Sequence, residues 1–118
     1  MQNHKLVMRE HLNHYGYLFG GNLLKWVDEH AWIGATMEFP GCSFVTIAMD
    51  NVEFRKSVGE GTILRFEVDR TKTGRTSVQY EVNVFRGEGG SAKADVVFST
   101  HVTLVRVDEQ GHKTPLPS

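Results

Sequence analysis

Residues 13–28 have the sequence NHYGYLFGGNLLKWVD, a polar loop with three glycines that leads directly into an apolar helical pattern. The pattern lasts to about Met37 and places apolar side chains on more than one face of the helix. Phe39-Pro40-Gly41 ends it, because proline and glycine do not easily continue a helix. A helix this apolar is usually surrounded by other structure. We therefore expect one central helix over residues 20–37.

After the helix, the hydrophobic period changes to the period of two that is typical of strands. Strand-like runs cover residues 44–54, 64–69, 78–84 and 96–107, and turns lie around residues 59–61, 72–75 and 87–91. A short apolar run, His4–Met8, predicts an edge strand. One helix followed by four long strands predicts an α+β fold in which an antiparallel sheet curls around the helix. Because exposed edges of such a sheet often join with a second copy, we also expect a dimer.

The composition limits the class of protein. A chain of 118 residues is long enough for one domain, residues 1–118, with a real core. Its net charge of −1 gives no long-range attraction to nucleic acid or to an anionic membrane. No apolar run approaches the ~20 residues of a membrane span. The single cysteine, Cys42, and the absence of an N-terminal signal pattern favour a reducing, cytoplasmic location.

Asp28 lies about two turns inside the expected helix, with apolar Leu24 and Trp32 one turn away on either side. Desolvation by such neighbours raises the pKa of a carboxyl group, and the greater basicity suits a general base. Two alternatives remain open. Residues 28–30 can form the solvated stripe of the helix, or Lys25 can hold Asp28 in a surface ion pair.

The loop before the helix is a candidate site for negative charge. Gly16, Gly20 and Gly21 let backbone N–H groups approach a ligand, and the positive end of the helix favours an oxyanion. The alternatives are that Gly20-Gly21 forms a close-packed corner and that Asn13 is a turn residue. The combination of such a loop with a helical carboxylate predicts acyl chemistry.

The chain resembles the single-domain acyl-CoA thioesterases of the hot-dog fold, the branch that includes the cytosolic long-chain acyl-CoA hydrolases. The order Asn, Gly, Phe-Gly-Gly and helical Asp within residues 13–28 carries the resemblance. It continues through Val45-Thr46 and through residues 54–58, 74–77 and 107–111. Ser57 departs from the pattern, since many members have proline there. The resemblance implies a curled antiparallel sheet of about five strands around one long central helix.

The resemblance also implies a reaction, the hydrolysis of acyl-CoA to fatty acid and CoA, which needs no metal and no cofactor. Asp28 is then the general base that activates water, or the nucleophile that forms a transient anhydride. Asn13 positions the water, and Thr46 orients the carboxylate. The N–H groups that hold the thioester oxygen are those of Gly16, Gly20 and Gly21. Sites of this family are assembled between two subunits, which implies a homodimer that assembles further into a tetramer or hexamer.

Coenzyme A carries phosphates, so basic and hydroxyl residues are expected along its path. The resemblance assigns this role to two segments at strand ends, Arg55-Lys56 and the turn Gly74, Arg75, Thr76 and Ser77. The alternative is a pair of ordinary polar turns.

Two other functions compete with thioester hydrolysis. A hot-dog dehydratase uses a histidine with an acidic residue, but His14 and His30 are not placed convincingly for that chemistry. A non-catalytic acyl-CoA-binding or regulatory domain keeps the CoA turns and does not need Asp28. The histidines show no metal-ligand spacing, and we expect His11, His14 and His30 in loops or on the surface. The length of the acyl chain stays open, with Trp26, Trp32 and Met37 as candidate lining residues.

Overall fold

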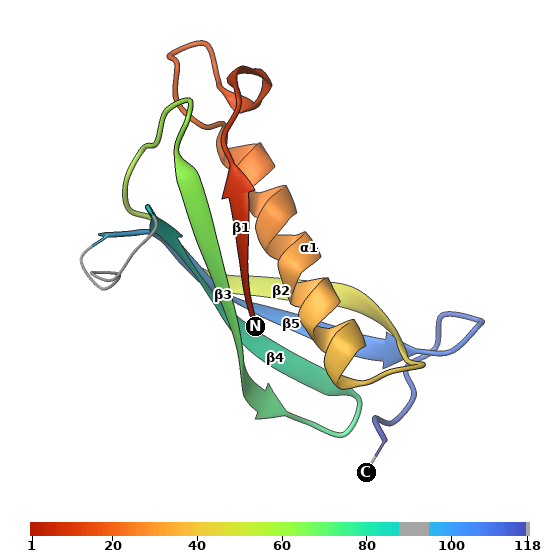
Figure 1. The fold of residues 1–118 in the computed structure, drawn as a ribbon. Helices are drawn as coiled ribbons and strands as arrows, with labels where there is room; N and C mark the ends of the chain where they lie inside the picture. The colour runs from red at the N-terminus through yellow and green to blue at the C-terminus, as the bar shows by residue number, and fades with distance from the viewer. Residues whose placement is uncertain (88–94, 118) are drawn as a thin grey trace.

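The computed structural model describes residues 1–87 and 95–117 and confirms the expected α+β fold (Figure 1). The strands are β1 (Gln2–Leu6), β2 (Ser43–Phe54), β3 (Ile63–Thr73), β4 (Ser77–Arg86) and β5 (Val96–Val107), the long helix is α1 (Gly20–Glu38), and a 3-10 helix, η1, covers Arg9–His11. Within these residues, no helix has the length and hydropathy of a membrane span. The turn expected at residues 87–91 lies outside the described residues after Gly87.

All five strands form one antiparallel sheet in the order β1-β3-β4-β5-β2. Several boundaries differ from the sequence-based expectation, and two of them have a clear structural reason. β1 ends at Leu6 rather than Met8, because the chain turns at Met8 into η1. β3 continues beyond Asp69 to Thr73, because its last residues stay paired with the start of β4.

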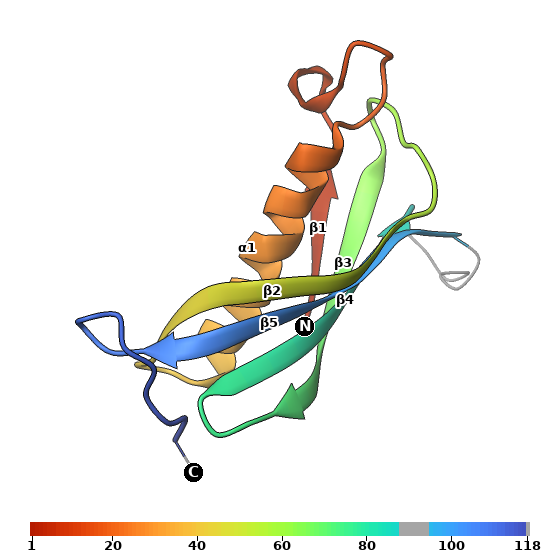
Figure 2. The same cartoon turned by 180° about the vertical axis from the view of Figure 1, so that it is seen from behind.

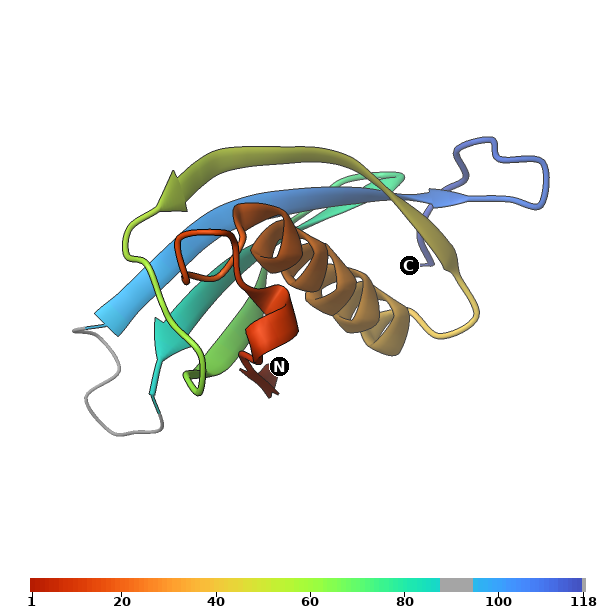
Figure 3. The same ribbon diagram turned by 90° about the horizontal axis from the view of Figure 1, so that it is seen from above.

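The sheet curves around one face of α1 (Figure 3). The buried residues of this face are Leu23, Trp26, Val27, Ala31, Gly34 and Ala35. At Gly34 the helix approaches β3 so closely that an added Cβ would lie 3.2 Å from Val68 Cγ1. Near the end of the helix, the hydroxyl of buried Tyr80 donates to Glu38 Oε1 at 2.7 Å. Burial and this bond raise the pKa of Tyr80, so the phenol stays protonated and remains a donor.

The opposite face of α1 is not covered in the single chain, contrary to the expectation of a fully wrapped helix. Lys25 and Glu29 are exposed on it, and so is the large apolar side chain of Trp32. The reason is that the sheet curves around only one side of the helix (Figure 3).

The two edges of the sheet differ. β1 is short, whereas β2 has 12 residues and exposes the apolar side chains of Val45, Ile47, Val52 and Phe54. Pairing of β2 with β5 is interrupted by register shifts between Thr46 and Ala48 and between Asp50 and Glu53. Asn51, inside the second shift, has a φ of 52°, in the left-handed region. β2 is therefore a long, apolar and irregular edge strand.

Candidate active site

Asp28 on α1 faces the edge strand β2. Thr46 Oγ1 donates a hydrogen bond to Asp28 Oδ1 at 2.6 Å, so the hydroxyl fixes one oxygen of the half-buried carboxylate. Among the described residues, Asp28 forms no ion pair with Lys25 and no second hydrogen bond. The expected neighbour of the carboxylate, Thr46, is thus in contact with it, and the Lys25 alternative does not hold in the single chain.

A groove runs between α1 and β2 beside this pair. Its volume is about 750 Å³, and its lining residues are Asp28, Glu29, Trp32, Ile33, Val45 and Thr46. A second bond crosses between the same two elements, from Trp32 Nε1 to the carbonyl oxygen of Phe44 at 3.2 Å. We refer to this space as the Asp28 groove. Carboxylate and hydroxyl groups together with apolar walls suit a substrate that has a polar reacting centre and an apolar chain.

Asn13 forms a turn in the loop before α1. Its Oδ1 accepts hydrogen bonds from the N–H groups of Tyr15 at 2.9 Å and Tyr17 at 3.2 Å. Its own N–H donates to the carbonyl oxygen of Tyr17 at 2.7 Å. Among the described residues, the side-chain Nδ2 has no acceptor. Asn13 is therefore a turn residue that keeps a free amide donor, and it is not among the residues that line the Asp28 groove.

The three glycines of the loop differ in how their N–H groups are used. The N–H of Gly16 donates to the carbonyl oxygen of Asn13 at 3.0 Å, and the φ of +87° at Gly16 explains the glycine. An N–H that already closes a turn is not available to an oxyanion, which argues against the role expected for Gly16. Gly20 and Gly21 are the first two residues of α1, whose N–H groups have no acceptor within the helix.

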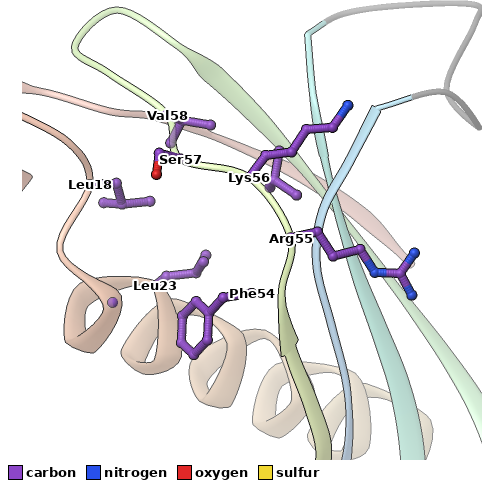
Figure 4. Close-up of a pocket in the computed structure, with 9 residues that line it drawn as sticks. Leu18, Leu23, Phe54, Arg55, Lys56, Ser57 and Val58 are labelled. Atoms are coloured by element: carbon purple, nitrogen blue, oxygen red, sulfur yellow. The ribbon is translucent and has the colours of Figure 1, made fainter.

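A second pocket, of about 220 Å³, lies at this end of α1 (Figure 4). Its lining residues are Leu18, Gly20, Leu23, Phe54, Arg55, Lys56, Ser57, Val58 and Val97. The side chains of Arg55 and Lys56 extend away from Leu18 and Leu23 (Figure 4). The pocket therefore has apolar walls near the helix and two cations directed outward.

Both cations form ion pairs on the surface. Arg55 Nη2 lies 2.7 Å from Glu53 Oε1, and Lys56 Nζ lies 2.9 Å from Asp95 Oδ1. Asp95 also pairs with Arg86. Hydrogen bonds from Arg86 and Lys56 lower the pKa of Asp95 to about 2, so Asp95 stays charged at neutral pH. A phosphate that binds these cations must compete with the two carboxylates.

The second predicted CoA segment, residues 74–77, lies at the other end of the sheet (Figure 2). It forms the turn between β3 and β4, where the N–H of Gly74 donates to the carbonyl oxygen of Ser77 at 2.8 Å. Ser77 opposes Val105 on β5, which in turn opposes Val45 near the start of β2, whereas residues 55–56 follow the end of β2. One chain therefore does not bring the two candidate CoA segments together.

The sequence reasoning missed several features of the groove. Glu29, Ile33 and Val45 line it, but their roles depend on how α1 lies against β2. The only available signal was the apolar helix itself, which indicated Trp32 as a lining residue. His30 also differs from the expected surface group, since its ring stacks on Phe66 with 4.4 Å between centroids. Its Nδ1 lies 2.6 Å from the carbonyl oxygen of Trp26.

One helix packed in a curved antiparallel sheet is the architecture of the hot-dog fold. The chain belongs to the thioesterase superfamily, which it matches over residues 15–93. It is 29% identical over 105 residues to an uncharacterized acyl-CoA thioester hydrolase of Bacillus subtilis. That match covers 89% of this chain but only 60% of the relative's length.

Solved structures show the same likeness. A hexameric thioesterase from Yersinia pestis superposes with a TM-score of 0.89 at 28% identity, covering 98% of this chain and 93% of that one. An acyl-CoA hydrolase from Staphylococcus aureus, in complex with coenzyme A, superposes with a TM-score of 0.88 at 26% identity, covering 100% of this chain and 70% of that one.

The Staphylococcus aureus hydrolase has been solved as alanine variants of one asparagine, one aspartate and one threonine. In that chain, the replaced asparagine and aspartate are as far apart in number as Asn13 and Asp28 are here. The replaced threonine follows the aspartate at a separation one residue shorter than that between Asp28 and Thr46.

Proposed function

We propose that the protein hydrolyses acyl-CoA thioesters to a free acid and CoA. The observation that carries this proposal is the 2.6 Å hydrogen bond from Thr46 to Asp28 at the side of an apolar groove, in a chain of the thioesterase superfamily. The likeness in residue type and separation to the three residues replaced in the Staphylococcus aureus hydrolase supports it.

The reaction needs one carboxylate. With Oδ1 held by Thr46, Oδ2 of Asp28 accepts a proton from a water molecule as the water oxygen attacks the thioester carbonyl. A new C–O bond forms, the C–S bond breaks, and the proton passes from Asp28 to the leaving thiolate. Alternatively, Oδ2 attacks the carbonyl itself and forms an anhydride that water then hydrolyses. Both routes give the same products, and both use the hydrogen bond from Thr46 to Asp28.

The negative charge that develops on the thioester oxygen needs donors. The N–H groups of Gly20 and Gly21 are free of helical acceptors, and the positive end of the helix dipole adds to them. Yet Gly20 lies eight residues before Asp28, roughly 12 Å along the axis at 1.5 Å per residue. One carbonyl group does not reach both. The donors of one chain therefore complement the carboxylate of another.

A homodimer supplies that second chain. β2 is an edge strand that pairs with β5 on one side and, among the described residues, with no strand on the other; its apolar side chains are exposed, and the uncovered face of α1 with Trp32 lies beside it. When the β2 strands of two chains pair, the outward backbone N–H and C=O groups of each strand gain hydrogen-bond partners, and the apolar surface is covered. The hexameric state of the Yersinia pestis thioesterase supports further assembly of such dimers into a hexamer rather than a tetramer.

The proposed oligomer also accounts for the distance between the two candidate CoA segments. Arg55 and Lys56 lie at the opposite end of the sheet from residues 74–77 within one chain. In an oligomer, the segment of one copy and the turn of another can bind the phosphates of one CoA. Arg55 then exchanges Glu53 for a phosphate oxygen, and its planar guanidinium suits that contact.

The variants Asp28→Ala and Asp28→Asn test the proposal. We expect both to lose acyl-CoA hydrolysis by a factor of hundreds or more, measured as release of free thiol, while CoA binding measured by calorimetry stays unchanged. Asp69→Asn is the matched control, because Asp69 is an exposed aspartate on β3 outside the groove. Wild-type turnover in either Asp28 variant would remove Asp28 from the reaction.

The same assays separate the rival functions. A wild-type protein that binds CoA without releasing thiol from any acyl-CoA is a binding domain. A dehydratase would form an enoyl product from a 3-hydroxyacyl substrate. The half-buried ring of His30 stacks on the buried ring of Phe66, and this orientation argues against that chemistry.

A further inference from the structure

Two hydrogen bonds tie α1 to β2, and they lie one helical turn apart. Asp28 is bound by Thr46, and Trp32, four residues later, is bound to the carbonyl oxygen of Phe44. The strand partner moves back by two residues as the helix partner moves forward by four, so the two elements run antiparallel. Four helical residues advance about 6 Å and two strand residues about 6.7 Å, so the spacing agrees on both sides.

The direction of an acyl chain follows from the lining of the Asp28 groove. The reacting carbonyl must lie beside Asp28, where the carboxylate and the Thr46 hydroxyl are. The apolar lining residues Trp32 and Ile33 follow Asp28 by four and five residues, so they lie toward the C-terminal end of α1. An alkyl chain avoids the polar end and extends toward these side chains.

The indole of Trp32 is held across this path. It projects from α1, and its Nε1–H reaches the backbone of β2, so the side chain connects the two walls of the groove. A tryptophan held by such a bond does not swing aside freely, because leaving the site breaks the hydrogen bond. Trp26 and Met37, the other two lining candidates from the sequence, are absent from the groove. Trp26 is buried in the core, and Met37 is 70% exposed elsewhere on the helix.

We propose that Trp32 sets the upper limit of acyl-chain length, so that the substrates are short, straight-chain acyl-CoA thioesters. The indole lies about one turn, ~6 Å, beyond Asp28. A zigzag chain with C–C bonds near 1.5 Å advances about 1.25 Å per bond, so roughly six carbons span that distance. This inference rests on the proposed thioesterase function.

The test is a panel of acetyl-, butyryl-, hexanoyl-, octanoyl- and lauroyl-CoA, assayed by free-thiol release with the full chain. For the wild type we expect kcat/KM to be highest at roughly six carbons or fewer and to fall for octanoyl- and lauroyl-CoA. In Trp32→Ala, the ratio of kcat/KM for lauroyl-CoA to that for butyryl-CoA should rise at least tenfold. Trp32→Phe keeps a ring without the Nε1–H donor, and its ratio should rise less than that of Trp32→Ala. Met37→Ala, on the same helix, should leave the ratio unchanged.

Trp32→Leu is a second enlarging variant in case Trp32→Ala does not fold, which circular dichroism reports. A wild-type chain-length profile in a folded Trp32→Ala or Trp32→Leu that still hydrolyses acyl-CoA overturns the role of Trp32 and leaves the proposed function intact. A wild-type protein that hydrolyses long chains as well as short ones also overturns it. If the wild type hydrolyses no member of the panel, the proposed function itself fails, and the chain-length limit fails with it.

Discussion

The two ends of the segment from Asn13 to Asp28 are built in different ways. The carboxylate of Asp28 is held by a side chain from another element, Thr46 on β2. Among the residues that the structure describes, the side chain of Asn13 binds the backbone of its own loop alone, at Tyr15 and Tyr17. One chain therefore holds the carboxylate end through a tertiary contact, whereas the amide end is a local turn whose Nδ2 donor has no acceptor within residues 1–87 and 95–117. Changes at the two ends should have separable effects.

The sharpest test of this comparison is to mix two inactive variants, Asn13→Ala and Asp28→Ala. If each site takes its amide from one chain and its carboxylate from another, a mixed dimer contains one intact site out of two. Random reassortment gives mixed dimers in about half of the population. We therefore expect roughly one quarter of wild-type activity after the subunits are dissociated and reassembled. Activity that stays at the level of the separate variants would place both groups in one chain.

Thr46 tests the carboxylate end alone. Thr46→Val removes the hydroxyl and keeps the shape, so Asp28 loses its only side-chain partner among the described residues. We expect kcat to fall roughly ten- to a hundredfold with little change in KM, since the loss of a hydrogen bond to a charged group costs roughly 1.5–3 kcal/mol. Thr46→Ser restores the donor and should restore most of the rate. Equal losses in the Val and Ser variants would show that the hydroxyl does not matter.

At the amide end, variants of Asn13 separate its contribution to stability from its contribution to activity. Asn13→Ala removes the acceptor of two backbone N–H groups and should lower the free energy of unfolding by about 1 kcal/mol, measured by urea denaturation. Asn13→Asp keeps an oxygen acceptor and should keep most of that stability. It lacks the Nδ2 donor and should still lose activity. A fully active Asn13→Asp protein would leave Asn13 with a structural role alone.

The smallest expected effect concerns the surface next to the amide end. The N–H of Leu18 in the Asn13 loop donates to the carbonyl oxygen of Val58, and Lys56 beside it pairs with Asp95. Hydrogen bonds from Arg86 and Lys56 hold the pKa of Asp95 at about 2. Its contribution to stability is therefore present above the ordinary pKa near 4 and is lost as the pH falls toward 2.

We expect Asp95→Asn to melt slightly below the wild type at pH 7, since exposed ion pairs stabilise little. The difference in melting temperature should vanish near pH 2. A difference that persists at pH 2 would mean that the ion pairs are not its cause.

Most of the fold could be predicted from the sequence, because period and turn residues are local signals. The helix at Gly20–Glu38 and the four long strands follow from them directly. Errors occurred where pairing with a neighbour decides the boundary, as at the end of β3, where residues up to Thr73 stay in the ladder. The uncovered face of α1 was also missed, because period alone does not tell how far a sheet curves around a helix.

The residues of the candidate site could be predicted only in part from the sequence. The pairing of Thr46 with Asp28 was expected from the resemblance, and the hydrogen bond between them agrees with it. The bond from Trp32 to Phe44 has no local signal, because it depends on the position of β2 along α1. Arg55-Lys56 and residues 74–77 lie far apart because of the order of the strands in the sheet. The two turns are similarly polar, and their sequences do not indicate that order.

The interruptions in β2 restrict what can pair with this strand. A regular, apolar edge would accept almost any extended segment, including strands of partly folded chains, and would seed aggregates. In β2, the two register shifts and the left-handed Asn51 disturb the spacing of the free N–H and C=O groups. An arbitrary strand cannot match that spacing, whereas an antiparallel copy of β2 presents the same irregularities in return. The dimer proposed above therefore uses an edge that other strands match poorly, which limits pairing with partly folded chains.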